Sequence, residues 1–249
     1  MEILFNEYTE LELIEHVRTV LLILRNLSFI KANEHAVRRC PKLVALVIAL
    51  FVEYRDREIT LNCLDIVTSI AKHIVLKEIH VGKELVATLF RTMHEAREED
   101  LVDETMECLR RLSLSGGNEE YLEEISDKDI KLLVSLLLSE NVETRECALE
   151  ILCTISDRKT ATKVKIASQK NCISRLVALI ACGGNTIAEE KISKLAALTL
   201  ANLNLAPSNK KLIMPYEEEL ALIAASDEKT SKVIAEILGD LDSYQVYSK

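Results

Sequence analysis

The sequence of 249 residues has few of the residues that interrupt regular secondary structure. It contains six glycines, three prolines and no tryptophan, and aromatic residues make up only 4% of it. An all-β sandwich or barrel needs turn-forming residues about every 8–12 positions, so this scarcity argues against that class. Apolar residues account for 49% of the chain, which excludes general disorder. The expected class is all-α, because helix-forming residues dominate the composition.

Acidic residues outnumber basic ones, 40 to 31, and long hydrophobic runs are scarce. The net charge of −9 opposes a dedicated nucleic-acid-binding domain, which usually presents a basic field to phosphate. The longest uncharged apolar run, residues 43–52, has ten residues, about half of the ~20 that a membrane-spanning helix needs. We therefore expect no membrane partner, and direct nucleic-acid binding by this chain is not favoured.

No pattern in the chain predicts a catalytic residue, a metal site or a cofactor. The seven cysteines form no Cys-x-x-Cys pair, which suggests a reducing intracellular compartment, and most lie within apolar helical patterns. The histidines form no His-Glu-x-x-His motif, and no glycine-rich phosphate loop is present. His73 and His80 are spaced to share a helix face, but packed or solvated histidines explain them more simply than metal ligands do.

One five-residue pattern recurs along the chain. It consists of an apolar residue, two variable residues, a second apolar residue and then usually a small or polar one. Its first positions are 38 to 48 residues apart. The six anchors are Leu24–Ser28, Val67–Ala71, Leu109–Ser113, Leu152–Ser156, Leu200–Asn204 and Leu238–Asp242.

A second apolar segment follows each of the first five anchors after 18 to 24 residues. Each repeat therefore contains at least two helices, and a period of about 40–47 residues is that of armadillo and HEAT solenoids. The second segments begin at Leu43, Leu85, Leu132, Leu176 and Leu220.

Residues Leu132–Ser156 resemble an armadillo repeat most clearly. They contain an apolar helix pattern, a Ser-Glu-Asn turn and then a helix pattern with Glu-x-Ala-Leu-x-x-Leu. The resemblance covers roughly residues 18–242 and implies a right-handed α-α superhelix of about six repeats. We expect one domain over residues 1–249, with an N-terminal helix over residues 1–17.

The resemblance also implies where a partner would lie. In armadillo proteins the third helix of each repeat lines the concave face, so the position before the second apolar residue of each anchor is expected there. Importin-type and catenin-type members carry an asparagine ladder at this position, and the importin type adds tryptophan. Only Asn26 and Asn202 are asparagines here, and tryptophan is absent, so an import receptor is not indicated. The six positions are Asn26, Ser69, Arg111, Thr154, Asn202 and Asp240.

Two interpretations of the asparagines stay open at this stage. Asn26 and Asn202 either bind a partner or satisfy a nearby helix end. Two interpretations of a basic stretch between residues 157 and 175 stay open as well: it docks an acidic helix or the DNA backbone, or it is simply a solvated face. No aromatic residue interleaves its cations, so stacking on single-stranded nucleic acid is not indicated. Its basic residues are Arg158, Lys159, Lys163, Lys165, Lys170 and Arg175.

Three sequence segments resemble one branch of the armadillo proteins. Val20–Val37, Leu61–Ile74 and Pro215–Leu238 are similar to the armadillo region of AT-rich-interaction-domain subunits of SWI/SNF chromatin remodellers. The PBAF- or RSC-type subunit is the first choice and the BAF-type subunit the second. The resemblance implies a nuclear, non-catalytic scaffold that contacts remodeller core scaffold subunits and ATPase-associated helices. The alternative is a cytosolic armadillo adaptor that holds an extended peptide through Asn26 and Asn202.

The first residues of the chain suggest a further contact. Ile3, Leu4 and Phe5 belong to an apolar helix pattern with no obvious neighbour. Because terminal repeats need a polar outer face, we expect this helix to pack on another segment or on a second copy of the chain.

Overall fold

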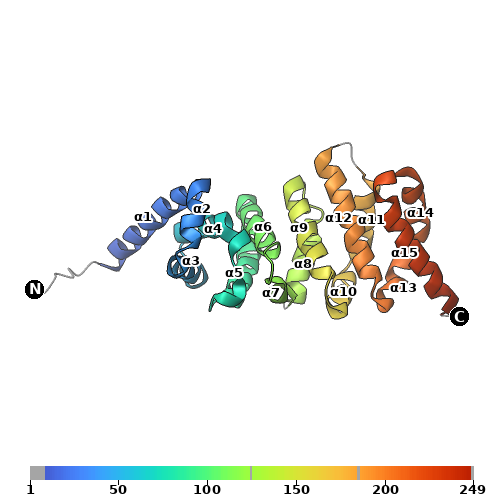
Figure 1. Ribbon diagram of the computed structural model, residues 1–249, viewed down its shortest axis with the longest axis horizontal. Coiled ribbons are helices and arrows are strands. Elements are labelled where there is room, and N and C mark those ends of the chain that lie inside the picture. The colour runs from blue at the N-terminus through green and yellow to red at the C-terminus, as the bar shows by residue number, and fades with distance from the viewer. Residues whose placement is uncertain (1–8, 124, 184–185, 248–249) are drawn as a thin grey trace, which may run out of the picture. The chain divides into compact units, whose positions relative to one another are not determined.

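A computed structural model of the chain describes residues 9–123, 125–183 and 186–247, and no strand occurs among them (Figure 1). Four short 3-10 helices lie among the α-helices: η1 (Ala71–His73), η2 (Leu76–Glu78), η3 (Pro207–Asn209) and η4 (Met214–Tyr216). The α-helices are α1 (Glu10–Ser28), α2 (Lys31–Arg38), α3 (Pro41–Glu53), α4 (Arg57–Ile70), α5 (Gly82–Glu95), α6 (Glu99–Ser113), α7 (Glu119–Glu123), α8 (Asp127–Leu136), α9 (Val142–Ser156), α10 (Thr160–Ala167), α11 (Cys172–Ala181), α12 (Ile187–Asn204), α13 (Lys210–Ile213), α14 (Glu217–Ser226) and α15 (Glu228–Tyr247).

The helices follow one another in groups of three. A short first segment precedes a second helix, which packs against a longer third helix, as α3 does with α4 and α11 with α12. The third helices are α4, α6, α9, α12 and α15, and α1 packs against α4 as another third helix would. All six predicted anchors lie on α1 or on these third helices, the one at Val67 running into η1. The predicted all-α repeat architecture is therefore confirmed.

The helix starts have local causes that the sequence carries. Reciprocal capping boxes, in which a hydroxyl and a carboxylate satisfy each other's backbone N–H groups, open α1 at Thr9, α8 at Ser126 and α12 at Thr186. Pro41 occupies the first turn of α3, where its missing N–H leaves no donor unpaired. These caps fix the point at which each helix leaves its connector.

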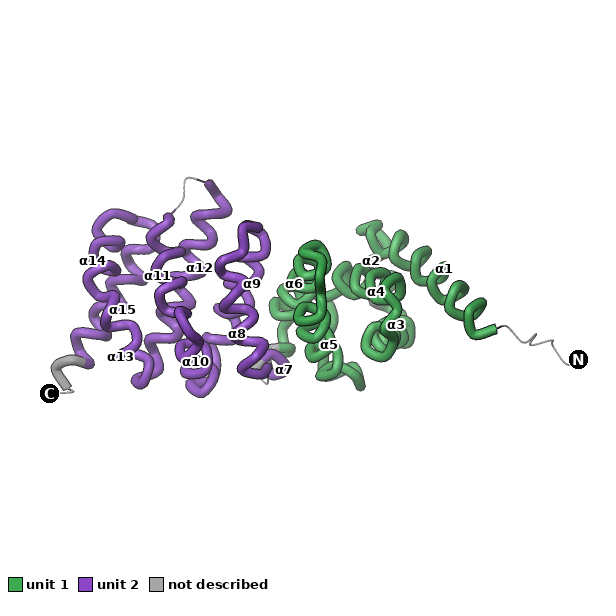
Figure 2. The backbone as a smooth tube through the Cα atoms, turned by 180° about the vertical axis from the view of Figure 1, so that it is seen from behind, with its two compact units in different colours: residues 1–118 green, residues 119–249 purple. Residues whose placement is uncertain are grey.

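Contacts group the helices into two compact units, Met1–Asn118 and Glu119–Lys249 (Figure 2). The boundary falls between two repeats, after α6 and before α7. Each unit has an apolar core of its own, with Phe51, Leu64 and Leu89 in the first and Leu149 and Leu200 in the second. The single domain predicted over residues 1–249 stays a prediction.

Two buried asparagines, one in each unit, bond the end of a third helix, α6 or α12, and the connector of the preceding repeat. In the first unit, Asn118 donates to the carbonyls of Leu112, at 3.0 Å, and of Ile74, at 2.7 Å, and accepts from the N–H of Leu76 at 2.7 Å. In the second unit, Asn209 donates to the carbonyls of Leu203 and Lys163. We call Asn118 and Asn209 the closing asparagines.

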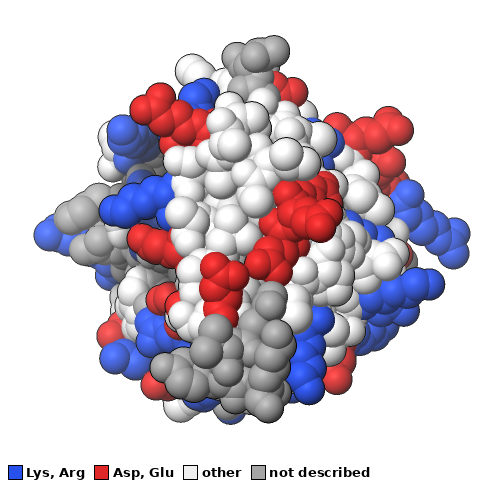
Figure 3. Space-filling view, turned by 90° about the vertical axis from the view of Figure 1, so that its right-hand side faces the viewer, with Lys and Arg blue, Asp and Glu red and all other residues white. Residues whose placement is uncertain are grey.

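The N-terminal helix differs from the sequence expectation, and the C-terminal end exposes an apolar residue. Ile3, Leu4 and Phe5 lie outside the described residues, and residues 10–17 form one continuous helix, α1, with the first anchor, because nothing interrupts the helix pattern after the Thr9 cap. At the other end, α14 leaves Leu222 72% exposed. Uncharged surface is broad on the side of the molecule shown in Figure 3.

We expect Asn118→Ala to lower the free energy of unfolding by about 2–3 kcal/mol, because it leaves buried backbone groups without a partner. The exposed Asn26 supplies the control, and Asn26→Ala is expected to change stability by less than about 0.5 kcal/mol. Urea denaturation followed by circular dichroism measures both. Equal stabilities for the two variants would contradict the role assigned to Asn118.

Candidate functional site

Within each unit, the third helices expose one side on which charged and apolar residues are found. On α12, Lys191, Lys194 and Leu198 follow one another at spacings of three and four and are all exposed, so they share one face of the helix. We call this side of α1, α4 and α6 in the first unit, and of α9, α12 and α15 in the second, the third-helix face.

In the second unit, ion pairs link each third helix to the next across this face. Lys191 on α12 pairs with Glu146 and, at 2.6 Å, with Glu150, both on α9. Glu190 on α12 pairs with Lys194 on its own helix and, at 2.7 Å, with Lys229 on α15. These two lysines hold the pKa of the Glu190 carboxyl at about 2. These charged side chains are on the protein surface, and they also connect neighbouring repeats.

In the first unit the polarity of the pairs is reversed, with the cations on the earlier helix. Arg18 on α1 donates to Asp56 at the start of α4 at 2.5 Å, which lowers the pKa of that carboxyl. Arg25 pairs with Asp65 on α4 and lies over the ring of Phe29 at 5.3 Å. Partial burial and the nearby charge of Asp65 raise the pKa of Glu104 on α6. Negative charge therefore gathers where α4 faces α6.

Two of the predicted positions bond to their own helix. The hydroxyl of Ser69 donates to the carbonyl of Ile66 at 2.7 Å, and the hydroxyl of Thr154 donates to that of Glu150 at 2.8 Å. Both side chains are half-buried. Their hydroxyl protons are used within the helix, so in this state each offers a partner only an oxygen acceptor.

Two other predicted positions reach the preceding third helix. Arg111 pairs with Glu107 at 2.5 Å and donates to the carbonyl of Thr68 on α4 at 3.3 Å. Asn202 donates to the carbonyl of Cys153 at 3.3 Å and to the hydroxyl of Ser156 at 3.1 Å, both on α9. For Asn202 the bonds seen here are therefore those of a helix-end contact between repeats.

The remaining two predicted positions are exposed. Asn26 is exposed on α1, and Asp240 lies on α15, where its carboxylate accepts from Asn204 at 3.3 Å. Of the two predicted asparagines, Asn26 is thus the one whose side chain faces solvent. Its role in binding stays a prediction.

The basic stretch of α10 and its surroundings needs a correction. Lys163 is only 5% exposed, because its ammonium turns inward and donates to the carbonyl of Ser156 at 2.5 Å, the end of α9. Arg175 is half-buried and donates to the carbonyl of Val134 at 2.7 Å. Both cations satisfy helix ends rather than contribute to the surface. Those that remain exposed are Arg158, Lys159, Lys165 and Lys170.

The thiols and histidines do not assemble into a reactive centre in the part of the chain that the structure describes. Burial raises the pKa values of Cys63, Cys108 and Cys172 to about 12. No group of three or more potential metal ligands occurs among the described residues. His73 lies in η1 and His80 in the turn before α5, so they do not share a helix, although both line one cavity.

Within the described ranges, none of the helices combines the length and the apolar character that crossing a membrane requires.

Sequence reasoning did not identify the residues that link the repeats. Each closing asparagine stands six positions after the second apolar residue of its anchor, and Asn33 repeats that spacing after Leu27, to whose carbonyl it donates at 3.0 Å. This recurrence is visible in the sequence. The partners of Lys191 and Lys229 carry no such signal, because they lie about one repeat away.

Comparisons with curated proteins find similarity over most of the chain. No family model matches it. It is 22% identical over 232 residues to the armadillo repeat-containing protein LFR of Arabidopsis thaliana and 22% identical over 237 residues to the protein of that name in Oryza sativa subsp. japonica. Each alignment covers 88% of this chain and 49% of the relative. The chain thus spans about half the length of the curated relatives it matches.

Solved structures give the fold directly. A designed armadillo repeat protein aligns with a TM-score of 0.69 at 16% identity, covering 95% of this chain and 96% of its own. Computationally designed armadillo repeat proteins for modular peptide recognition align with a TM-score of 0.69 at 14% identity, covering 93% and 94%. A designed armadillo repeat protein in complex with the peptide (KR)4 aligns with a TM-score of 0.63 at 16% identity, covering 95% of each chain. The chain has the armadillo-repeat fold.

The charged pairs of the third-helix face predict a pH dependence. The pKa of Glu190 is about 2 against an ordinary 4.5, so the stabilisation it gives is present above about pH 4.5 and is lost as the pH falls toward 2. Lys229→Met removes one of its two donors and is expected to raise this pKa. An NMR titration of the Glu190 carboxyl measures it, with Lys232→Met on the same exposed side of α15 as the control. A titration that Lys229→Met leaves unchanged would refute the pair.

Proposed function

We propose that this chain is a non-catalytic protein-interaction scaffold whose partner lies on the third-helix face. The observation that carries the proposal is the continuity of this face within each unit, where ion pairs link successive third helices and Leu198 is exposed. Designed proteins with this fold include one solved in complex with a peptide. A repeat solenoid offers an extended surface of this kind instead of an enclosed active site.

The partners we propose are subunits of a SWI/SNF-type chromatin remodeller in the nucleus. Support for this assignment comes from the sequence phrases Val20–Val37, Leu61–Ile74 and Pro215–Leu238, which resemble the armadillo region of the AT-rich-interaction-domain subunits. The chain would hold core scaffold subunits or ATPase-associated helices through a broad surface.

Co-purification of the chain with remodeller core subunits from nuclear extract tests this assignment. Leu198→Glu places a charge on the third-helix face, where Leu198 is 45% exposed, and is expected to reduce recovery of those subunits at least about fivefold. Leu222→Glu is the matched control, because Leu222 is exposed on the second helix α14.

Two outcomes would contradict different parts of the proposal. Recovery of cytoplasmic cargo alone would refute the remodeller assignment and leave the scaffold proposal standing. Loss of the remodeller subunits with Leu222→Glu, but not with Leu198→Glu, would move the interface away from the third-helix face.

A peptide adaptor is the second candidate, and the charge of the first unit favours a basic peptide. Asp65 accepts from Arg25, and the neighbouring Glu104 has a raised pKa because of partial burial and the charge of Asp65. A carboxyl group with a raised pKa costs stability at neutral pH. A lysine or arginine from a peptide would relieve this repulsion.

We therefore expect Glu104→Gln to weaken binding of a Lys-Arg repeat peptide about fivefold, the equivalent of roughly 1 kcal/mol, and to raise the stability of the free protein slightly. Fluorescence anisotropy and thermal unfolding measure the two effects. Glu218→Gln, at an exposed position of α14, controls for the change in net charge. Equal affinity for the two variants would rule out this site, whereas Asn202→Ala is a poor probe because Asn202 also links α12 to α9.

A further inference from the structure

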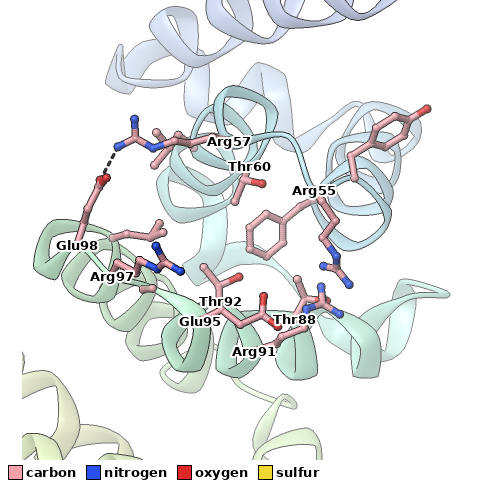
Figure 4. A pocket seen from close by; sticks show the side chains of 14 residues that line it. Arg55, Arg57, Thr60, Thr88, Arg91, Thr92, Glu95, Arg97 and Glu98 are labelled. Atoms are coloured by element: carbon pink, nitrogen blue, oxygen red, sulfur yellow. Dashed lines mark hydrogen bonds and ion pairs between the residues drawn. The ribbon is translucent and has the colours of Figure 1, made fainter. Parts of the chain in front are cut away.

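A cavity of about 270 Å³ opens in the first unit, at the turns that join second helices to third helices (Figure 4). The ends of α3 and α5 and the starts of α4 and α6 surround it. Buried Phe51 contributes to its lining, together with Leu61 and Leu101. It is formed by the connectors at one edge of the repeats rather than by the third-helix face.

The lining of this cavity is positively charged on a chain whose net charge is −9. Four arginines, Arg55, Arg57, Arg91 and Arg97, outnumber two glutamates, Glu95 and Glu98. Arg57 pairs with Glu98, as the dashed line in Figure 4 shows. No ion pair joins Arg55 or Arg97 to another of the described residues.

The cations form two groups on opposite sides of the cavity. Arg55 and Arg91 lie together at one side with Glu95, and Arg97 lies at the other beside the Arg57–Glu98 pair (Figure 4). Arg91 donates to the hydroxyl of Thr88 at 3.2 Å. Its pKa is lowered, first by partial burial and then by the charge of Arg55, and Glu95 offsets this only in part. Positive charge is therefore held close to positive charge without full compensation.

The corresponding place in the second unit shows what arginines do when they serve the fold. A cavity of about 650 Å³ lies there between α8, α11 and the start of α12, and Arg145 and Arg175 line it. Arg145 donates to the carbonyl of Ser139 at 2.5 Å, and Arg175 donates to that of Val134 at 2.7 Å. Both guanidinium groups are bound to backbone oxygens. Arg55 and Arg97 have no such bond among the described residues, so the fold does not account for their placement.

We propose that this arginine-lined cavity docks an acidic segment of a partner protein, with one carboxylate at the Arg55–Arg91 side, a second at Arg97, and an apolar side chain between them against Leu61 and Leu101. Guanidinium groups bind carboxylates through charge-assisted hydrogen bonds, often in pairs. Two separated cationic groups with an apolar strip between them fit a segment with spaced carboxylates better than a single compact anion. This site is independent of the partner proposed for the third-helix face.

Binding of synthetic peptides to the full chain tests the proposal. The probe is a fluorescent peptide of about ten residues with aspartates and glutamates flanking central leucines, and its counterpart carries asparagine and glutamine instead. Arg55→Gln combined with Arg97→Gln is expected to weaken binding of the acidic peptide about tenfold, whereas the amide peptide binds neither protein measurably. Raising the salt from about 50 mM to about 300 mM is expected to weaken binding as well.

The matched control removes two positive charges elsewhere. Lys211→Gln combined with Lys232→Gln changes exposed lysines of the second unit that lie outside the basic stretch of residues 157–175 and is expected to alter affinity less than about twofold. Equal loss in both double variants would show that only net charge matters and would overturn the site. Tighter binding of a phosphoserine version or of single-stranded RNA, with the same dependence on Arg55 and Arg97, would replace the carboxylate partner by a phosphate-bearing one. If the wild-type chain binds none of the probes, the proposal is refuted. The function proposed for the third-helix face would not be affected.

Discussion

The hydrogen bonds of the closing asparagines are the contacts on which the stacking of repeats depends. A third helix ends with carbonyl groups that no residue of its own helix satisfies, and a solenoid has no second layer to cover them. The side-chain amides of Asn118 and Asn209 each donate hydrogen bonds to two carbonyl groups. One carbonyl is at the end of the asparagine's own third helix, and the other is in the connector of the preceding repeat. Lys163 bonds the end of α9 from the segment that follows it, which explains why a cation is buried there. An apolar replacement at any of these positions would leave buried backbone carbonyl groups without a hydrogen-bond partner.

The sequence predicted the third helices well because their information is local. Apolar residues at helical spacing and capping residues such as Ser126 act within one or two turns. The first segments were harder, since η1, η2 and the five-residue α7 are too short to show a helical period. Lys163 was placed on the surface for a related reason. A lysine within a short polar stretch looks exposed, and its burial depends on a carbonyl seven residues earlier that the pattern does not reveal.

The candidate site was predictable only in outline. The anchor positions do lie on the third helices, but Arg111 and Asn202 turn out to bond the neighbouring repeat, while Asn26 faces solvent. The arginine-lined cavity could not be predicted from the sequence, because its cations come from two stretches of the chain, Arg55–Arg57 and Arg91–Arg97, more than thirty residues apart. These arginines lie close together because successive repeats stack on one another, and no sequence motif indicates it. The same stacking brings Asp65 on α4 near Glu104 on α6. These two charges are about one repeat apart in the sequence, so local sequence patterns do not reveal that they are neighbours.

The hydrogen bonds between repeats join residues that are only about one repeat apart in the sequence, and this has a consequence for folding. Asn118 reaches back 42 residues to Leu76 and 44 to Ile74, and Asn209 reaches back 46 to Lys163. These separations are all about one repeat. Folding therefore need not wait for distant segments to meet, because a structured repeat supplies the template for the next one. A chain of this kind has low contact order for its length, and its folding rate should depend on the slowest pair of neighbouring repeats rather than on the number of repeats.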